Sequence, residues 1–208
     1  MRASFAAVNK QKALQFDLIY SPQIIPKWTP RFLYDHLHWK TLSGKWEIDP
    51  IKKTIFLKNP KIKNVENISI IGSPHWNNIR FNVRFEILTD SIKPPEGGVI
   101  LYYLFKNIKN YYSFHFCIYK KRIELIKRYN GIWTTIGRQD FNLKINEEYS
   151  VRITANDCIH RCQIDGGDAI EVKDTDISEG CVAIGAKYCG AEFSNISANI
   201  DSSHRDDK

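Results

Sequence analysis

The stretch Ile79–Ile87, with the sequence IRFNVRFEI, decides the fold class of this chain. Large apolar side chains stand at every second position, and charged or amide side chains fill the positions between them. Side chains on a β-strand point alternately to opposite faces, so this period of two predicts a strand with one buried and one wet face. The outward positions are Arg80, Asn82, Arg84 and Glu86.

The same kind of pattern continues through the rest of the chain. Val99–Phe105 is a nearly continuous apolar run that predicts a central strand, and Tyr112–Ile118 alternates again. Further short strands are expected at Arg122–Arg128, Trp133–Gly137, Glu148–Ala155, Ile159–Ile164 and Cys181–Ala186, with turn residues such as Asn130-Gly131 and Asp165-Gly166-Gly167 between them. Many short strands joined by such turns indicate an antiparallel sandwich or barrel. No apolar pattern keeps a helical period, so we expect an all-β chain almost without helix.

The length of 208 residues fits one large domain, and 43% hydrophobic residues suffice for a substantial core. We expect an extended N-terminal arm over residues 1–31, the sandwich over 32–200 and a polar tail over 201–208. No stretch approaches the ~18 apolar residues of a membrane-spanning helix, so no membrane contact is expected.

The net charge and the cysteine count indicate which partners and which cellular compartment to expect. The net charge is +7, but the lysines are spread along the chain, which favours a solvated basic surface over a nucleic-acid site. Five cysteines, an odd number, without a secretory signal near Met1 predict reduced thiols and a cytoplasmic location. Nothing in the sequence indicates an oligomeric state.

Several short segments carry a resemblance to a known superfamily. They are Tyr34-Asp35 with Gly44-Lys45-Trp46, Lys106-Asn107 with Asn110-Tyr111-Tyr112, Ile123-Glu124-Leu125 with Gly131-Ile132-Trp133, Ile164-Asp165-Gly166, Gly180-Cys181-Val182-Ala183-Ile184-Gly185 and the closing Phe193-Ser194-Asn195-Ile196. As a set they resemble the concanavalin A-like superfamily, especially its laminin G-like and 3-keto-glycoside-hydrolase-like branches. The resemblance covers residues 32–200 and implies a two-sheet antiparallel jelly-roll sandwich. It also implies sugar binding, although the fold hosts lectins, glycanases, lyases and non-catalytic modules.

Catalytic carboxylates are not evident in the sequence. Retaining glycosidases need two carboxylates roughly 5 Å apart, and family 16 glucanases of this fold carry a Glu-x-Asp-x-Glu cluster on one strand. The corresponding strand here, Arg122–Arg128, holds only Glu124, and we interpret Asp174 and Asp176 as turn residues. A glycoside hydrolase or polysaccharide lyase of the same superfamily stays an alternative, and a protein-interaction domain is a second one.

The candidate metal ligands are better explained as structural residues. Cys158, His160 and Cys162 share one strand face, but ligands at such spacing point side by side, and reduced cysteine is commonly a small buried hydrophobe. The resemblance implies a calcium position with oxygens from the opening and closing strands. Asp35 keeps the opening oxygen, whereas Ser194 replaces the usual closing aspartate and weakens the site. We therefore expect no cofactor.

The outward positions of several strands supply a hypothetical glycan site. Aromatic rings stack on the C–H faces of sugars, while arginine, amide and carboxylate groups bind hydroxyls, and arginines also suit the carboxylate or sulfate of an acidic glycan. If side chains of neighbouring strands converge, one concave surface carries Arg80, Asn82, Arg84, Glu86, Tyr102, Tyr111, His115, Tyr119, Arg122 and Glu124. The parity of Tyr102 depends on whether Val99–Phe105 contains a bulge. The sequence thus predicts a glycan-binding module.

Overall fold

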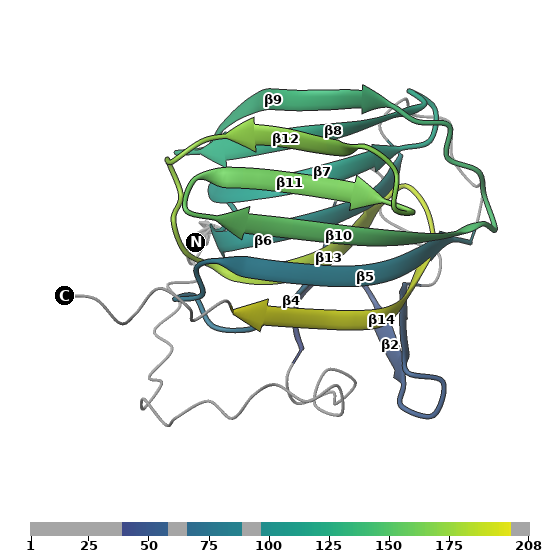
Figure 1. The fold of residues 1–208 in the computed structure, drawn as a ribbon. Helices are drawn as coiled ribbons and strands as arrows, with labels where there is room; N and C mark the ends of the chain where they lie inside the picture. Colours follow the sequence, from purple (N-terminus) through teal and green to yellow (C-terminus); the bar gives the residue numbers. More distant parts are fainter. Residues whose placement is uncertain (1–38, 58–65, 89–96, 201–208) are drawn as a thin grey trace, which may run out of the picture.

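A computed structural model describes residues 39–57, 66–88 and 97–200 of the chain. Within these ranges the protein is all β, without a helix, and two antiparallel sheets lie face to face (Figure 1). The predicted two-sheet antiparallel sandwich is confirmed. The expected N-terminal arm over 1–31 and the polar tail over 201–208 lie outside the described residues.

In the described part of the chain, each sheet contains seven strands. Sheet A runs in the order β1 (Lys40–Ser43), β4 (Asn67–Ile71), β13 (Cys181–Lys187), β6 (Gly98–Asn107), β7 (Asn110–Cys117), β8 (Arg122–Tyr129) and β9 (Ile132–Asp140). Sheet B runs in the order β12 (Ala169–Lys173), β11 (Ile159–Ile164), β10 (Glu148–Asn156), β5 (Ile79–Ile87), β14 (Ala191–Ile200), β3 (Thr54–Leu57) and β2 (Trp46–Asp49). Successive hairpins connect the strands from β6 to β9 in sheet A and from β10 to β12 in sheet B. β13 then pairs between β4 and β6 in sheet A, and β14 pairs between β5 and β3 in sheet B.

Apolar side chains from the two inner faces interdigitate to form the core. The burial of β5 alternates along its whole length, as its sequence predicts. Phe85 of β5 meets Phe116 of β7 across the sheets, with the ring centroids 4.9 Å apart. His160 and Cys162 of β11 also point inward and are buried, so the structural interpretation of the Cys-x-His-x-Cys run agrees with the structure.

A bulge in β6 changes the direction of its side chains after Tyr103. The pairing with β7 shifts between Tyr103 and Asn107, and Leu104 has a positive φ of 46°. Tyr103 and Leu104 therefore both face the core, and Phe105 turns outward. Gly180 lies against this bulge, because a Cβ there would come within 2.2 Å of the Leu104 carbonyl carbon.

A second apolar cluster lies on the outer side of sheet A. We call it the outer cluster; its buried members are Ile68, Ile70, Ile100, Tyr102, Phe105, Tyr111, Cys181 and Ala183. It spans β4, β13, β6 and β7, so these strands are buried on both faces and read as continuous apolar runs. The outer face of sheet A therefore keeps its polar side chains mainly on β7, β8 and β9.

The five cysteines are all free thiols, and four of them are buried. Burial raises the pKa of Cys117 and Cys181 to about 11, so both are protonated near neutral pH. These thiols have the environment of structural, unreactive cysteines.

The contact between Phe85 and Phe116 gives a direct test of the core. Phe116→Ala should lower the free energy of unfolding by ~3–5 kcal/mol, because it leaves a cavity between the sheets. Lys52→Ala, in an exposed turn, should change it by less than ~0.5 kcal/mol. Urea denaturation of both variants measures the difference. A Phe116→Ala protein as stable as the Lys52→Ala protein would show that the sheets do not pack through these rings.

Candidate functional site

The residues predicted to bind sugar divide between two surfaces of the sandwich. Arg80, Asn82, Arg84 and Glu86 point outward from sheet B, whereas Tyr102, Tyr111, His115, Tyr119, Arg122 and Glu124 belong to sheet A and the β7–β8 turn. The sheets pack through their inner faces, so the two groups lie on opposite sides of the molecule (Figure 1). The expectation of one shared surface is wrong, because β5 pairs with β10 and β14 rather than with β6.

Tyr102 and Tyr111 keep the predicted outward direction but are not open to a ligand. They are 0% and 1% exposed, respectively, as members of the outer cluster. Tyr102 donates a hydrogen bond to Glu66 Oε2 at 2.8 Å, and Tyr111 stacks on Phe105 with a centroid distance of 5.4 Å. Both rings are therefore buried in the outer cluster and are not accessible to a glycan.

Trp133 of β9 is a candidate site residue that the prediction from sequence did not include. It is 43% exposed, and the Arg128 guanidinium carbon lies 4.8 Å from its ring centroid. The rings of Tyr111 and His115 meet the indole edge-on, at 5.8 and 6.1 Å. Arg128 and Trp133 are direct partners across β8 and β9, and this register is the signal that would have placed the indole outward.

His115 lies beside this indole and is uncharged at neutral pH. Its Nε2 lies 3.0 Å from the Ser113 hydroxyl oxygen. Burial, together with the positive charges of Lys187 and Lys120, lowers its pKa from 6.5 to about 3. A neutral imidazole carries one donor and one acceptor, which suits a hydroxyl group as partner.

Glu124 and Arg122 complete the polar part of this surface. Glu124 is 7% exposed. Its Oε1 forms an ion pair with Arg122 Nη2 at 2.6 Å, and its Oε2 lies 3.8 Å from Lys120 Nζ. Arg122 Nε is buried without a hydrogen-bond partner in the part of the chain that the structure describes. Glu124 lies directly between His115 of β7 and Arg138 of β9 in the register of the strands.

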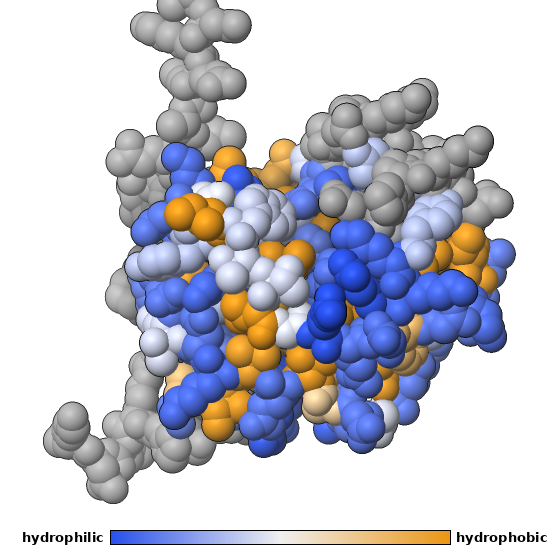
Figure 2. All heavy atoms as spheres, turned by 90° about the horizontal axis from the view of Figure 1, so that it is seen from above, coloured by the Kyte–Doolittle hydropathy of each residue, from blue (hydrophilic) through white to orange (hydrophobic). Residues whose placement is uncertain are grey.

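We call the surface formed by these side chains the Trp133 face; its residues are His115, Arg122, Glu124, Arg128, Trp133 and Arg138. Tyr119, which is 48% exposed, follows β7 in the turn to β8. Figure 2 looks down on the edge formed by β9 and β12 and shows hydrophobic patches set among hydrophilic residues. The Trp133 face thus combines one exposed aromatic ring with planar polar groups, as ligand recognition by stacking and hydrogen bonding requires.

The outer face of sheet B has a different chemistry. Arg84 forms an exposed 3.2 Å ion pair with Glu148, and Arg152 Nε donates to Asn82 Oδ1 at 3.3 Å. The outward residues of β5 and β10 are polar or charged, without an aromatic ring among them. The surface over β5 and β10 therefore offers charge and hydrogen bonds but no aromatic ring for stacking.

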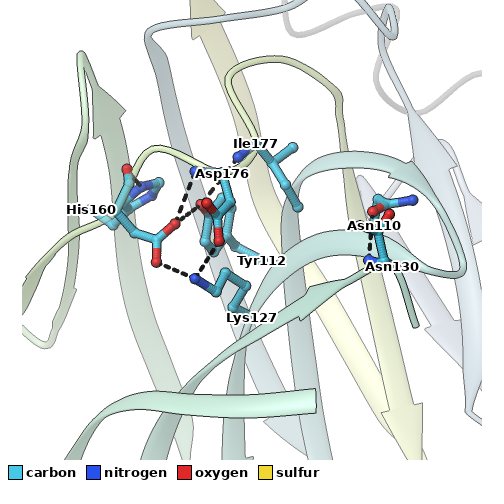
Figure 3. Close-up of polar contacts among 8 residues, drawn as sticks. Asn110, Tyr112, Lys127, Asn130, His160, Asp176 and Ile177 are labelled. Carbon is cyan, nitrogen blue, oxygen red and sulfur yellow. Dashed lines mark hydrogen bonds and ion pairs between the residues drawn. The ribbon is translucent and has the colours of Figure 1, made fainter. Parts of the chain in front are cut away.

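A polar cluster at one end of the sandwich fastens the β12–β13 connection to sheet A (Figure 3). Lys127 Nζ donates to Asp174 Oδ2 at 2.5 Å and to Asp176 Oδ2 at 2.6 Å. The Tyr112 hydroxyl donates to Asp174 Oδ1, and His160 Nε2 lies 2.9 Å from the Asp174 carbonyl oxygen. Three strands from both sheets thus converge on Asp174.

The Asp174 carboxylate is suited to a structural role rather than to acid–base catalysis. Burial alone would raise the pKa of Asp174, but hydrogen bonds from Lys127 and Tyr112 bring it below its usual value. A general acid in glycoside hydrolysis needs a raised pKa. Asp176 N also donates to Asp174 Oδ1 at 3.0 Å, which is the turn geometry expected from the sequence.

Metal ligands do not gather in the described ranges. Among those residues no three His, Cys, Asp or Glu side chains are close enough to hold a metal ion. Asp35, the expected opening position of a calcium site, lies outside the described residues. Nor does the part of the chain that the structure describes contain a helix able to span a membrane.

Comparison with known proteins defines the class of fold. No family model matches the sequence, and no curated protein matches it either. The solved carbohydrate-binding module CBM66 from Bacillus subtilis is similar, with a TM-score of 0.66 at 18% identity over 78% of this chain and 95% of that chain. The exoplasmic/lumenal domain of VIP36, in a Ca²⁺/Man3GlcNAc-bound form, gives a TM-score of 0.55 at 10% identity over 84% of this chain and 90% of that chain.

The GH43 protein BlXynB from Bacillus licheniformis is also similar, with a TM-score of 0.57 at 12% identity. The match covers 81% of this chain but 38% of that longer chain. At these identities the comparisons define the fold alone, which is the concanavalin A-like jelly-roll sandwich. The predicted jelly-roll sandwich is therefore confirmed as the fold of this chain.

The lowered pKa of His115 gives a pH-dependent stability. Below pH 6.5 the unfolded chain binds a proton at His115 that the folded chain does not, so the free energy of unfolding falls as the pH drops toward 3. Between pH 7.5 and 4.5 this loss should be on the order of 2–3 kcal/mol. His160, whose pKa burial also lowers, acts in the same direction.

Urea midpoints at several pH values measure this effect. His115→Gln, which cannot titrate, should flatten the pH dependence between pH 7.5 and 4.5. The same slope in the wild type and in His115→Gln would contradict the desolvated state of this imidazole.

Proposed function

We propose that the protein is a glycan-binding module and that its glycan binds on the Trp133 face. The observation that carries the proposal is the 43% exposed Trp133 ring set beside His115 and Arg128. An indole offers a flat apolar surface to the C–H face of a sugar ring, at little cost in side-chain entropy. The indole is held by three neighbouring side chains, so binding does not have to order it.

The polar groups around the indole supply the hydroxyl partners. His115 is neutral and can donate and accept, while the Arg122–Glu124 pair presents charged donors and acceptors. Glu124, which is 7% exposed, and the Arg122 guanidinium paired with it at 2.6 Å are the mostly buried polar groups that a ligand meets on this face. Specificity in a site of this kind comes from such buried polar groups, because an analogue that lacks the matching hydroxyl leaves them unpaired.

The similarity of fold to a carbohydrate-binding module and to a mannose-oligosaccharide complex of VIP36 supports the class of ligand. A hydrolase remains the alternative that the sequence left open. The Asp174–Asp176 pair does not favour it, because Lys127 bridges both carboxylates and its hydrogen bond helps to keep the pKa of Asp174 below the usual value, whereas a general acid needs a raised one.

Replacement of the indole tests the proposal. Trp133→Ala should weaken glycan binding on the order of 30-fold, because truncation of a central aromatic contact commonly costs ~2 kcal/mol and ~1.4 kcal/mol is tenfold. A glycan array identifies the ligand of the wild type, and titration calorimetry with that ligand measures the loss.

The matched control is Ile132→Ala, which removes a neighbouring side chain that is 71% exposed on the same strand. It should bind normally, and both variants should keep the wild-type circular dichroism spectrum. Normal binding by a folded Trp133→Ala protein, or no glycan bound by the wild type, would overturn the proposal.

A further inference from the structure

The outer face of sheet B, opposite the Trp133 face, contains a hollow of about 430 Å³. Its polar lining residues are Asn82, Arg84, Ser150, Arg152, Gln163 and Asn195, and none of the described residues that line it is acidic. The volume falls in the ~300–1,000 Å³ range of small-molecule sites. The hollow is thus lined by two arginines and neutral hydrogen-bonding groups, and the carboxylates of Glu148 and Asp165 contact its lining residues Arg84 and Ser150.

The strand register builds this hollow from two adjacent rows of side chains. Gln163, Arg152 and Asn82 are direct partners across β11, β10 and β5. In the next row Ser150 of β10 pairs with Arg84 of β5. Ser150 has a small side chain and Gly166 has none, which leaves space beside the long arginine side chains. A Cβ added at Gly166 would meet no atom within 4 Å.

A bulge in β14 closes one side of the hollow. The pairing of β14 with β5 shifts between Ser194 and Ser197, and Asn195 in this bulge has a positive φ of 47°. With its amide oriented to satisfy both groups, the Asn195 oxygen accepts from Arg84 Nε at 3.2 Å and Nη1 at 3.3 Å. Bulges commonly redirect a side chain beside a binding site, and this one brings Asn195 against Arg84.

The guanidinium of Arg152 is held in place with part of its donors unused. Ser197 Oγ accepts from Asn82 Nδ2 at 3.0 Å, and Asn82 Oδ1 accepts from Arg152 Nε at 3.3 Å. The two Nη groups of Arg152 make no hydrogen bond within the described ranges, so the outer edge of the fork can bind a ligand. Arg84 is partly neutralised by Glu148 at 3.2 Å, which makes Arg152 the principal anion-binding group.

We propose that this hollow binds the carboxylate of an acidic saccharide, a uronic acid unit. Arginine forks match the two oxygens of a carboxylate, and charge-assisted bonds of this kind are roughly twice as strong as neutral ones. The amides of Gln163 and Asn195 and the Ser150 hydroxyl then face the sugar hydroxyls. The site lies on the other sheet from the Trp133 face and does not depend on glycan binding there.

Nuclear magnetic resonance titration of the full chain with sodium glucuronate tests this site. At constant ionic strength, amide shifts should concentrate on β5, β10 and β11 around the hollow. Neutral glucose should bind there at least tenfold more weakly than glucuronate. Sodium sulfate, which lacks the sugar hydroxyls, should also bind at least tenfold more weakly. Arg152→Gln should weaken glucuronate binding tenfold or more without a change in fold.

The matched control is Arg161→Gln, which removes the same charge from the same face outside the hollow, where Arg161 pairs with Glu171 at 2.5 Å. It should bind glucuronate as the wild type does, and so should Trp133→Ala. Equal weakening by Arg152→Gln and Arg161→Gln would reduce the effect to general charge attraction and overturn the proposal. Sulfate binding as tight as glucuronate binding would overturn the assignment of a saccharide. Loss of glucuronate binding in Trp133→Ala would show that glucuronate binds on the Trp133 face and would overturn the proposed site.

Discussion

The burial of the two inner sheet faces against each other is the constraint on which the rest of the structure depends. Alternation along each strand sends one side chain in two to this interface, and the next one to an outer surface. Phe85 and Phe116 meet across the interface, so the direction of every neighbour on β5 and β7 follows from theirs. Gly137 lets the sheets approach at the β9–β12 edge, since a Cβ there would lie 2.9 Å from Val172 Cγ2.

Strand-level features could be predicted from sequence because they depend on local alternation. The bounds of β5 and β11 agree with the predicted Ile79–Ile87 and Ile159–Ile164. The arrangement of strands could not be predicted in the same way, because it depends on pairing between distant segments. β5 and β6 follow each other in the chain but belong to different sheets, and this single fact splits the predicted sugar-binding residues into two groups.

Besides the pairing of strands, alternation did not determine how far the outward side chains are exposed. Parity placed Tyr102 and Tyr111 outward, and the bulge at Leu104 comes too late in β6 to change Tyr102. An outward position is exposed only if nothing covers it, and both rings are buried in the outer cluster. Trp133 was missed although the Asn130-Gly131 turn pairs it with Arg128, because alternation along β9 alone does not show which face of this edge strand carries the indole.

The two outer faces of the sandwich differ because their residues meet different neighbours. On sheet A the outer cluster removes β4, β13 and β6 from the open surface, and the strands β7 to β9 remain. With strands ~4.8 Å apart, this open part is about 10 Å wide, so a ligand that crosses the strands meets one His115–Trp133 pair. A longer ligand has to run along the strands, past Glu124 and Arg122 toward the β7–β8 turn.

On sheet B the outer face stays polar across its central strands, and its arginines are held by amides instead of aromatic rings. The alternation of side chains along the strands thus gives a stacking surface on one side of the sandwich and an arginine-lined hollow on the other. Burial lowers the pKa of His115 on the first face, and the hydrogen bond to Asn82 leaves the Arg152 fork with unused donors on the second. The jelly roll supplies both outer surfaces, and the cross-strand partner of each outward residue decides what chemistry that surface can perform.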